Sequence, residues 1–117
     1  MLNVVVLMGR IVASPELQYT QTNIAKTRFT LAVERDFAKK NEDKETDFID
    51  VIAWRNTAEF ISKYFSKGSL VAIQGAIQTY TYTDTQGNKR KGFEVVASEV
   101  HFTGEKRKET EKEPADN

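Results

Sequence analysis

TDFIDVIAWRNTAEFISKYFSKG, residues 46–68, joins a strand pattern to a helix pattern and decides how the rest of the chain folds. Side chains alternate between the two faces of a strand, so Ile49, Val51 and Ala53 share one apolar face that is expected to pack in the core. The opposite face carries four residues, Phe48, Asp50, Ile52 and Trp54. Two large aromatic rings beside an aspartate are unusual on a solvent-exposed face, and we expect the function of the protein there.

The second half of this stretch predicts a short amphipathic helix. Asn56 has a side chain suited to capping its first turn. Ala58, Ile61 and Phe65 recur at the spacing of one helix face. Gly68 suits the left-handed residue that follows a helix. One strand leading into one short helix, in an otherwise β-rich chain, is typical of a small barrel plugged by a helix.

Four further segments have strand patterns, and they span residues 2–13, 25–35, 69–83 and 92–103. Gly9 and Gly75 interrupt two of them and suggest bulges or barrel corners. Residues 36–45 predict a polar hairpin loop, and residues 84–91 predict a turn with Gly87 and Asn88 at its tip. Three strands, a helix and two strands follow in the order of an OB-fold, a five-stranded Greek-key barrel with its helix between strands 3 and 4.

Composition indicates one cytosolic domain. A length of 117 residues fits a single core, and the absence of cysteine rules out disulfides and zinc–thiolate sites. No stretch resembles a signal peptide or approaches the ~20 apolar residues of a membrane span. Residues 105–117 contain no large apolar side chain, so we expect a disordered charged tail after a domain spanning residues 1–104. The net charge of zero neither favours nor excludes a nucleic-acid partner.

Catalysis is not indicated by any motif. His101 is the single histidine, and the glycines are isolated, so neither a metal-ligand cluster nor a phosphate-binding loop is apparent. We therefore expect no catalytic residues, no metal and no cofactor. A small nuclease or deaminase is the enzymatic alternative, and a metal-dependence assay on single strands would test it.

Exposed aromatic and basic residues favour nucleic-acid binding. The aromatic candidates outside the expected core are Phe37, Phe48, Trp54, Tyr80 and Tyr82. The basic candidates are Arg10, Lys26, Arg28, Arg55, Lys89, Arg90 and Lys91. Aromatic rings stack on any base and cations follow the phosphates, which gives binding with little sequence preference. Two alternatives remain: Phe48 and Trp54 could equally lie in the core or a subunit interface, and two cations suit an ordinary solvated strand face.

Several segments together resemble the bacterial and phage single-stranded DNA-binding protein family. They are LNVVVLMGRI with SPELQYT, FTLAVER, TDFIDVIAWRNTAEFISKYFSKGS, and QGN with FEVVASEVHF, and they span roughly residues 1–103 in family order. The resemblance implies an OB-fold that binds single-stranded DNA without catalysis, usually as a homotetramer. It also implies a role in DNA replication, recombination and repair.

Carried over by position, the family's base-stacking aromatics fall on Phe37, Phe48, Trp54 and Tyr82. As phosphate contacts we predict Lys26, Arg28, Arg55, Lys89 and Arg90. Asp50 stands where many relatives have a neutral or basic residue, which is expected to lower affinity locally.

Cellular members of this family usually end in an acidic tip closed by Pro-Phe that recruits replication and repair proteins. Residues 113–117 read EPADN, so we expect that recruitment to be missing, as in a phage, plasmid or accessory version. The alternative function is an OB module that binds RNA or a primosome or other replication protein. Competition between DNA and RNA oligomers separates these possibilities, because a reader of the 2′-hydroxyl prefers RNA.

Overall fold

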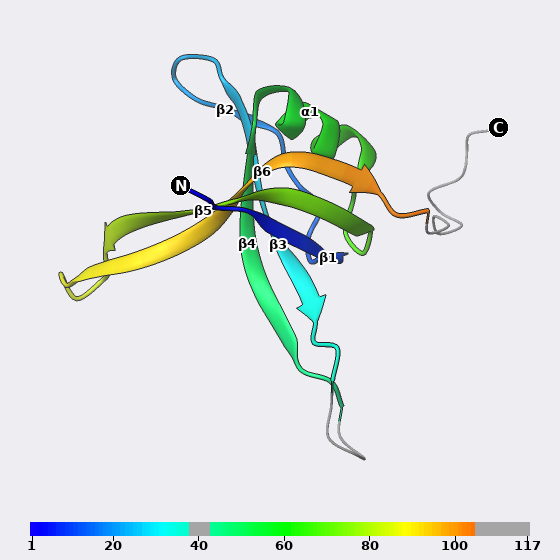
Figure 1. Ribbon diagram of the computed structural model, residues 1–117. Helices are drawn as coiled ribbons and strands as arrows, with labels where there is room; N and C mark the ends of the chain where they lie inside the picture. The colour runs from blue at the N-terminus through cyan, green and yellow to red at the C-terminus, as the bar shows by residue number, and fades with distance from the viewer. Residues whose placement is uncertain (38–42, 105–117) are drawn as a thin grey trace.

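The computed structural model describes residues 1–37 and 43–104, and most of these lie in β-strands (Figure 1). The elements in chain order are β1 (Val5–Ile11), β2 (Gln18–Tyr19), β3 (Ala25–Glu34), β4 (Thr46–Trp54), α1 (Arg55–Tyr64), β5 (Leu70–Thr83) and β6 (Lys89–Phe102). The tail expected at residues 105–117 lies outside the described residues. No helix in the described part of the chain is long and apolar enough to cross a membrane.

The five longer strands pair in a closed ring. The order around it is β1, β5, β6, β4 and β3, and β3 pairs with β1 again at Arg10↔Ala32 and Ile11↔Leu31. All of these pairs are antiparallel except β4 with β6, which run parallel at Val51↔Val95. This connectivity, with one helix between the third and fourth long strands, agrees with the OB-fold expected from the sequence.

The core fills the inside of the ring, and α1 lies over one end of it (Figure 1). The inward residues of β4 are the predicted ones, since Val51 and Ala53 are fully buried and Ile49 packs against the core. From the helix, Ala58 and Ile61 are buried. The remaining core residues come from the other long strands and from the chain that follows α1: Ile11, Ala25, Phe29, Leu31, Phe65, Val71, Ile73, Val95 and Ala97.

Two glycines allow the ring to close. A Cβ on Gly9 would lie 2.4 Å from the carbonyl oxygen of Ala32, and a Cβ on Gly75 would lie 2.1 Å from that of Val96. Both obstacles are backbone atoms, which cannot rotate away. The strand register also shifts at Gly75, which is the bulge or corner predicted there from the sequence, while Gly9 lets β1 pass close to the backbone of β3.

Three local predictions were wrong. The helix begins at Arg55, and its N-cap is Trp54 with no side-chain capping bond, so Asn56 is not the cap. The turn from β4 into α1 is instead made by Arg55 itself, whose φ of +57° is in the left-handed region. The segment before β3 contains the short strand β2, and β6 begins at Lys89 rather than at residue 92.

Two hairpins extend away from the ring. Figure 1 shows the β3–β4 hairpin and the β5–β6 hairpin leaving the body in different directions. The β5–β6 ladder continues beyond the core as far as Thr83↔Lys89. Their strands β4 and β6 are neighbours in the ring, so one face of the sheet continues from one hairpin to the other.

Candidate nucleic-acid interface

Strand register places most of the predicted binding residues on this one continuous outer face. Arg28, Ile52, Val96 and Ala76 form a single row across β3, β4, β6 and β5. An ion pair between Arg28 Nε and Glu94 Oε1, 3.6 Å apart, crosses β4 from β3 to β6 and shows that both side chains stand on the same side of the sheet. Side chains two residues along each strand from this row share the face.

Phe48 and Trp54 lie on this face and outside the core. Their exposed fractions are 67% and 37%, which excludes the alternative that both are core residues. Phe37 is 89% exposed and follows β3 on the same hairpin, beside a segment outside the described residues. Ile52, between the two rings, is 1% exposed although it lies outside the core cluster, and its partners in the ladder are Arg28 and Val96.

Two tyrosines occupy the same face on the β5–β6 hairpin. Tyr80 is opposite Gly92 and Tyr82 is opposite Arg90 in the ladder. Their ring centroids are 6.1 Å apart with the planes tilted by 46°, and the rings are 42% and 49% exposed. The hairpin therefore presents two adjacent rings to solvent.

The predicted phosphate contacts on the body of the sheet lie near these rings. Lys26 is opposite Trp54, and its Nζ lies 6.0 Å from the centroid of a Trp54 ring, at the outer limit of a cation–π interaction. Arg28 is exposed despite its ion pair with Glu94, and Arg55 is exposed at the start of α1. The Lys26 ammonium is therefore beside the Trp54 ring, and Arg28 stands on the same outer face one row along the sheet.

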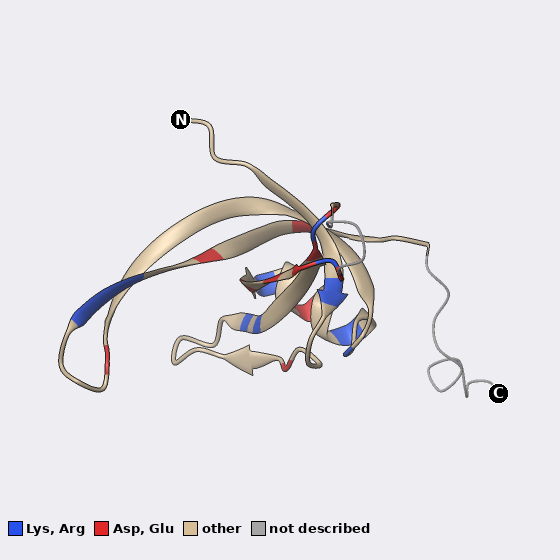
Figure 2. Cartoon of the chain, turned by 90° about the horizontal axis from the view of Figure 1, so that it is seen from below, with Lys and Arg blue, Asp and Glu red and all other residues tan. Residues whose placement is uncertain are grey.

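The remaining basic residues lie at the far end of the β5–β6 hairpin, where Figure 2 shows them as one blue segment. Arg90 is held by Asp84, with Nε and Oδ2 2.9 Å apart. Asp84 also accepts hydrogen bonds from the backbone N–H groups of Gln86 and Asn88. The bond from Arg90 and these N–H groups lower the pKa of Asp84, so the carboxylate stays charged and orders the turn while Lys89 is exposed.

Asp50 is an acidic residue on the aromatic face, as its alternation predicted, and Glu94 is another. The Oδ1 of Asp50 accepts a hydrogen bond of 3.0 Å from the Thr30 hydroxyl on the neighbouring strand. A carboxylate here adds negative charge between Phe48 and Trp54. We expect it to lower the affinity for a phosphate backbone at this point.

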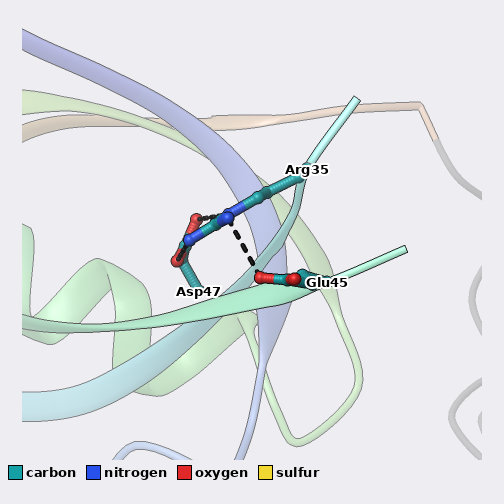
Figure 3. A network of polar contacts seen from close by, with 3 residues as sticks. All are labelled: Arg35, Glu45 and Asp47. Carbon is teal, nitrogen blue, oxygen red and sulfur yellow. Dashed lines mark hydrogen bonds and ion pairs between the residues drawn. The ribbon is translucent and has the colours of Figure 1, made fainter. Parts of the chain in front are cut away.

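An ion-pair cluster at the β3–β4 hairpin was not predicted from the sequence (Figure 3). Arg35 donates from Nε and Nη2 to the two carboxylate oxygens of Asp47, both at 3.0 Å, and its Nη1 lies 3.0 Å from Glu45. The bidentate bond from Arg35 lowers the pKa of Asp47. The cluster lies next to Phe48 in sequence and joins the two strands where their ladder ends.

Residues 1–37 and 43–104 contain no cluster of side chains arranged for metal binding or catalysis. No group of three or more His, Cys, Asp or Glu side chains there is placed to hold a metal ion. His101 is exposed and contacts Glu99 at 3.2 Å. A stacking surface with neighbouring cations is what the described side chains can form.

A model of the single-strand binding protein family matches residues 2–103. The chain belongs to this family. It is 44% identical over 102 residues to the single-stranded DNA-binding protein of Halalkalibacterium halodurans, an alignment that covers 87% of this chain and 61% of that protein. It is 39% identical over 117 residues to single-stranded DNA-binding protein 2 of Listeria monocytogenes, covering 100% of this chain and 73% of that protein.

A third relative in the single-strand binding protein family is single-stranded DNA-binding protein 1 of Streptococcus pyogenes, with 44% identity over 110 residues. That alignment covers 94% of this chain and 84% of the relative. The chain therefore spans about three fifths of the Halalkalibacterium protein and more of the other two. The names of these relatives describe binding proteins rather than enzymes, in agreement with the sequence prediction.

Proposed function

We propose that this protein binds single-stranded DNA with little sequence preference. The observation that carries the proposal is the continuous outer face, on which Phe48, Trp54 and Tyr82 are exposed while Lys26 and Arg28 stand beside them. Every base has a π-face, so ring stacking accepts all four bases, and cations bind phosphates irrespective of sequence. Family membership and the relatives' names support the same ligand.

The remaining site predictions belong to the same proposal. Phe37 would stack on a base beyond the β3–β4 hairpin, and Arg55, Lys89 and Arg90 would contact phosphates. Arg90 would do so with its charge partly offset by Asp84. Arg90 stands opposite Tyr82 on the outer face, whereas alternation turns Lys89 to the other face of the hairpin, so Lys89 would reach a phosphate only at the hairpin end and would contribute less than Arg90.

Trp54 allows a direct test because it is the single tryptophan of the chain. Adding oligo(dT) to the protein should quench its fluorescence, because a base stacked on the exposed side of the indole changes its environment. Competition with oligo(rU) of the same length separates a DNA ligand from an RNA ligand, since a reader of the 2′-hydroxyl prefers RNA. Unchanged emission at saturating oligo(dT), with no binding by polarisation of labelled DNA, would refute the proposal.

We further propose that the protein works as a homotetramer. Val6 and Met8 on the outer face of β1, with Val4 just before it, are all more than half exposed, and apolar patches of this kind mark protein contacts. Light scattering should give a mass of four chains, and Val6→Glu should lower it. A monomer at micromolar concentration would contradict this assembly.

The biological role that follows is the protection of unpaired strands during DNA replication, recombination and repair. We place this activity in the cytoplasm, at the nucleoid, where such strands arise. A fluorescent fusion should therefore form foci when replication forks are stalled, and a Phe48→Ala, Trp54→Ala fusion should not.

A further inference from the structure

Gly92, which is opposite Tyr80 in the β5–β6 ladder, has no role in the function proposed so far. A Cβ built on Gly92 would lie 2.8 Å from both Cε1 and Cζ of Tyr80 and 2.9 Å from its hydroxyl oxygen. The outer end of the phenol ring therefore covers the Cα of Gly92. Gly92 has no left-handed φ that would require glycine, so the ring is the feature of the structure that accounts for the missing side chain.

This contact fixes the ring without burying it. Tyr80 leans across the ladder onto the backbone of β6, yet it remains 42% exposed. A ring already held in one orientation loses less conformational entropy when a second flat group packs on it. Tyr82 stands next along the same face, with ring centroids 6.1 Å apart, so Tyr80 lies between Tyr82 and the body of the sheet.

We propose that Tyr80 is a further base-stacking residue of the DNA site and that Gly92 is its positioning residue. Tyr80 and Tyr82 together would present two neighbouring surfaces for two bases of one strand. The inference rests on the proposed function, because it assigns an additional contact within the same site. The positioning role makes a separate prediction. A methyl group added at Gly92 should change the affinity for DNA, although Gly92 itself has no ring to stack on a base.

The test compares Tyr80→Ala and Tyr80→Phe in the full chain, with Thr81→Ala as the matched control. Thr81 neighbours Tyr80 on β5 and points to the opposite face of the hairpin. Loss of one stacked base corresponds to a decrease in affinity for oligo(dT) of about 5- to 150-fold. Tyr80→Ala should show this loss, while Tyr80→Phe and Thr81→Ala should stay within about twofold of the parent chain, because the π-face is what binds.

A double-mutant cycle tests the positioning role. Gly92→Ala should weaken binding in the parent chain, because its methyl group displaces the far end of a flexible side chain. In the Tyr80→Ala background the same change should have no effect on affinity, since the ring that it displaces is gone. An equal loss in both backgrounds would make Gly92 merely structural and would overturn its assigned role.

Salt dependence supplies a second readout. A stacking contact involves no ion release, so Tyr80→Ala should leave the slope of log K against log salt unchanged, whereas Lys26→Gln, on the outer face beside Trp54, should lower its magnitude by about 0.7. If Tyr80→Ala binds like Thr81→Ala while Phe48→Ala is weakened, the inference about Tyr80 is overturned and the DNA-binding proposal stands. If the parent chain itself does not bind oligo(dT), both are overturned.

Discussion

Removing the rings of Phe48 and Trp54 is the sharpest test of the aromatic face. Each stacked base is worth about 1–3 kcal/mol when its ring is truncated to alanine. Trp54 lies six positions after Phe48 on β4, which at strand rise is about 20 Å. Effects at sites this far apart add, so Phe48→Ala with Trp54→Ala should cost about 2–6 kcal/mol of binding free energy. Affinity should fall between about 30-fold and about 2 × 10⁴-fold.

Fold stability should change much less than affinity, because both rings are on the solvent side of the sheet and Phe48 is the more exposed of the two. The assay is fluorescence polarisation of labelled oligo(dT) at fixed salt, paired with thermal melting followed by circular dichroism. Phe93→Ala is the matched control, since Phe93 is also exposed but lies on the opposite face of the β5–β6 hairpin from Tyr80. Undiminished affinity in the double variant would remove these rings from the site, and an equal loss in Phe93→Ala would show that any exposed ring has the same effect.

Three further predictions concern the fold and its ion pairs. Gly75→Ala should destabilise the protein by about 1–3 kcal/mol or more in urea denaturation, because its Cβ would meet the fixed carbonyl of Val96. Ile61→Ala should lower the free energy of unfolding by about 2–5 kcal/mol, because it leaves a cavity between helix and ring. The pKa of Asp47, measured by NMR titration, should lie below its ordinary value and rise in Arg35→Gln. A lowered pKa means that this ion pair contributes to stability above the ordinary carboxyl pKa and is lost as pH falls through the lowered one.

Controls for the two stability changes come from the same β5–β6 hairpin and the same helix. Gly92→Ala adds the same methyl group against a movable side chain and should be nearly neutral for stability. Glu59→Ala alters an exposed residue of α1, and its unfolding midpoint should stay close to the parent value. A Gly75→Ala protein as stable as Gly92→Ala would contradict the corner assignment, and an Asp47 titration unmoved by Arg35→Gln would contradict the ion pair.

Local patterns in the sequence were enough to predict the two faces of β4. Its alternation separated Val51 and Ala53, which are buried, from Phe48 and Trp54, which are exposed. The same period-two rule placed Tyr80 and Tyr82 together. Such predictions succeed because alternation follows from the backbone of a single strand and needs no knowledge of its partners.

Features that depend on how different strands pair with one another could not be predicted in this way. Ile52 is buried on the outer face because strands distant in sequence lie on both sides of it. The bidentate bond between Arg35 and Asp47 depends on pairing across a hairpin loop. The helix start was misplaced because Arg55 adopts a left-handed conformation, which is uncommon for a residue with a side chain.

The position of the aromatic hairpin rings relative to the core has a further consequence. Tyr80 and Tyr82 stand on a ladder that runs past the last core residue of β5, so little of the energy that holds the protein together depends on their identity. If these rings bind DNA as proposed, the affinity for DNA and the stability of the fold can therefore be changed separately. A designer could exchange these tyrosines for tryptophan or serine to obtain tighter or looser binders on an unchanged scaffold.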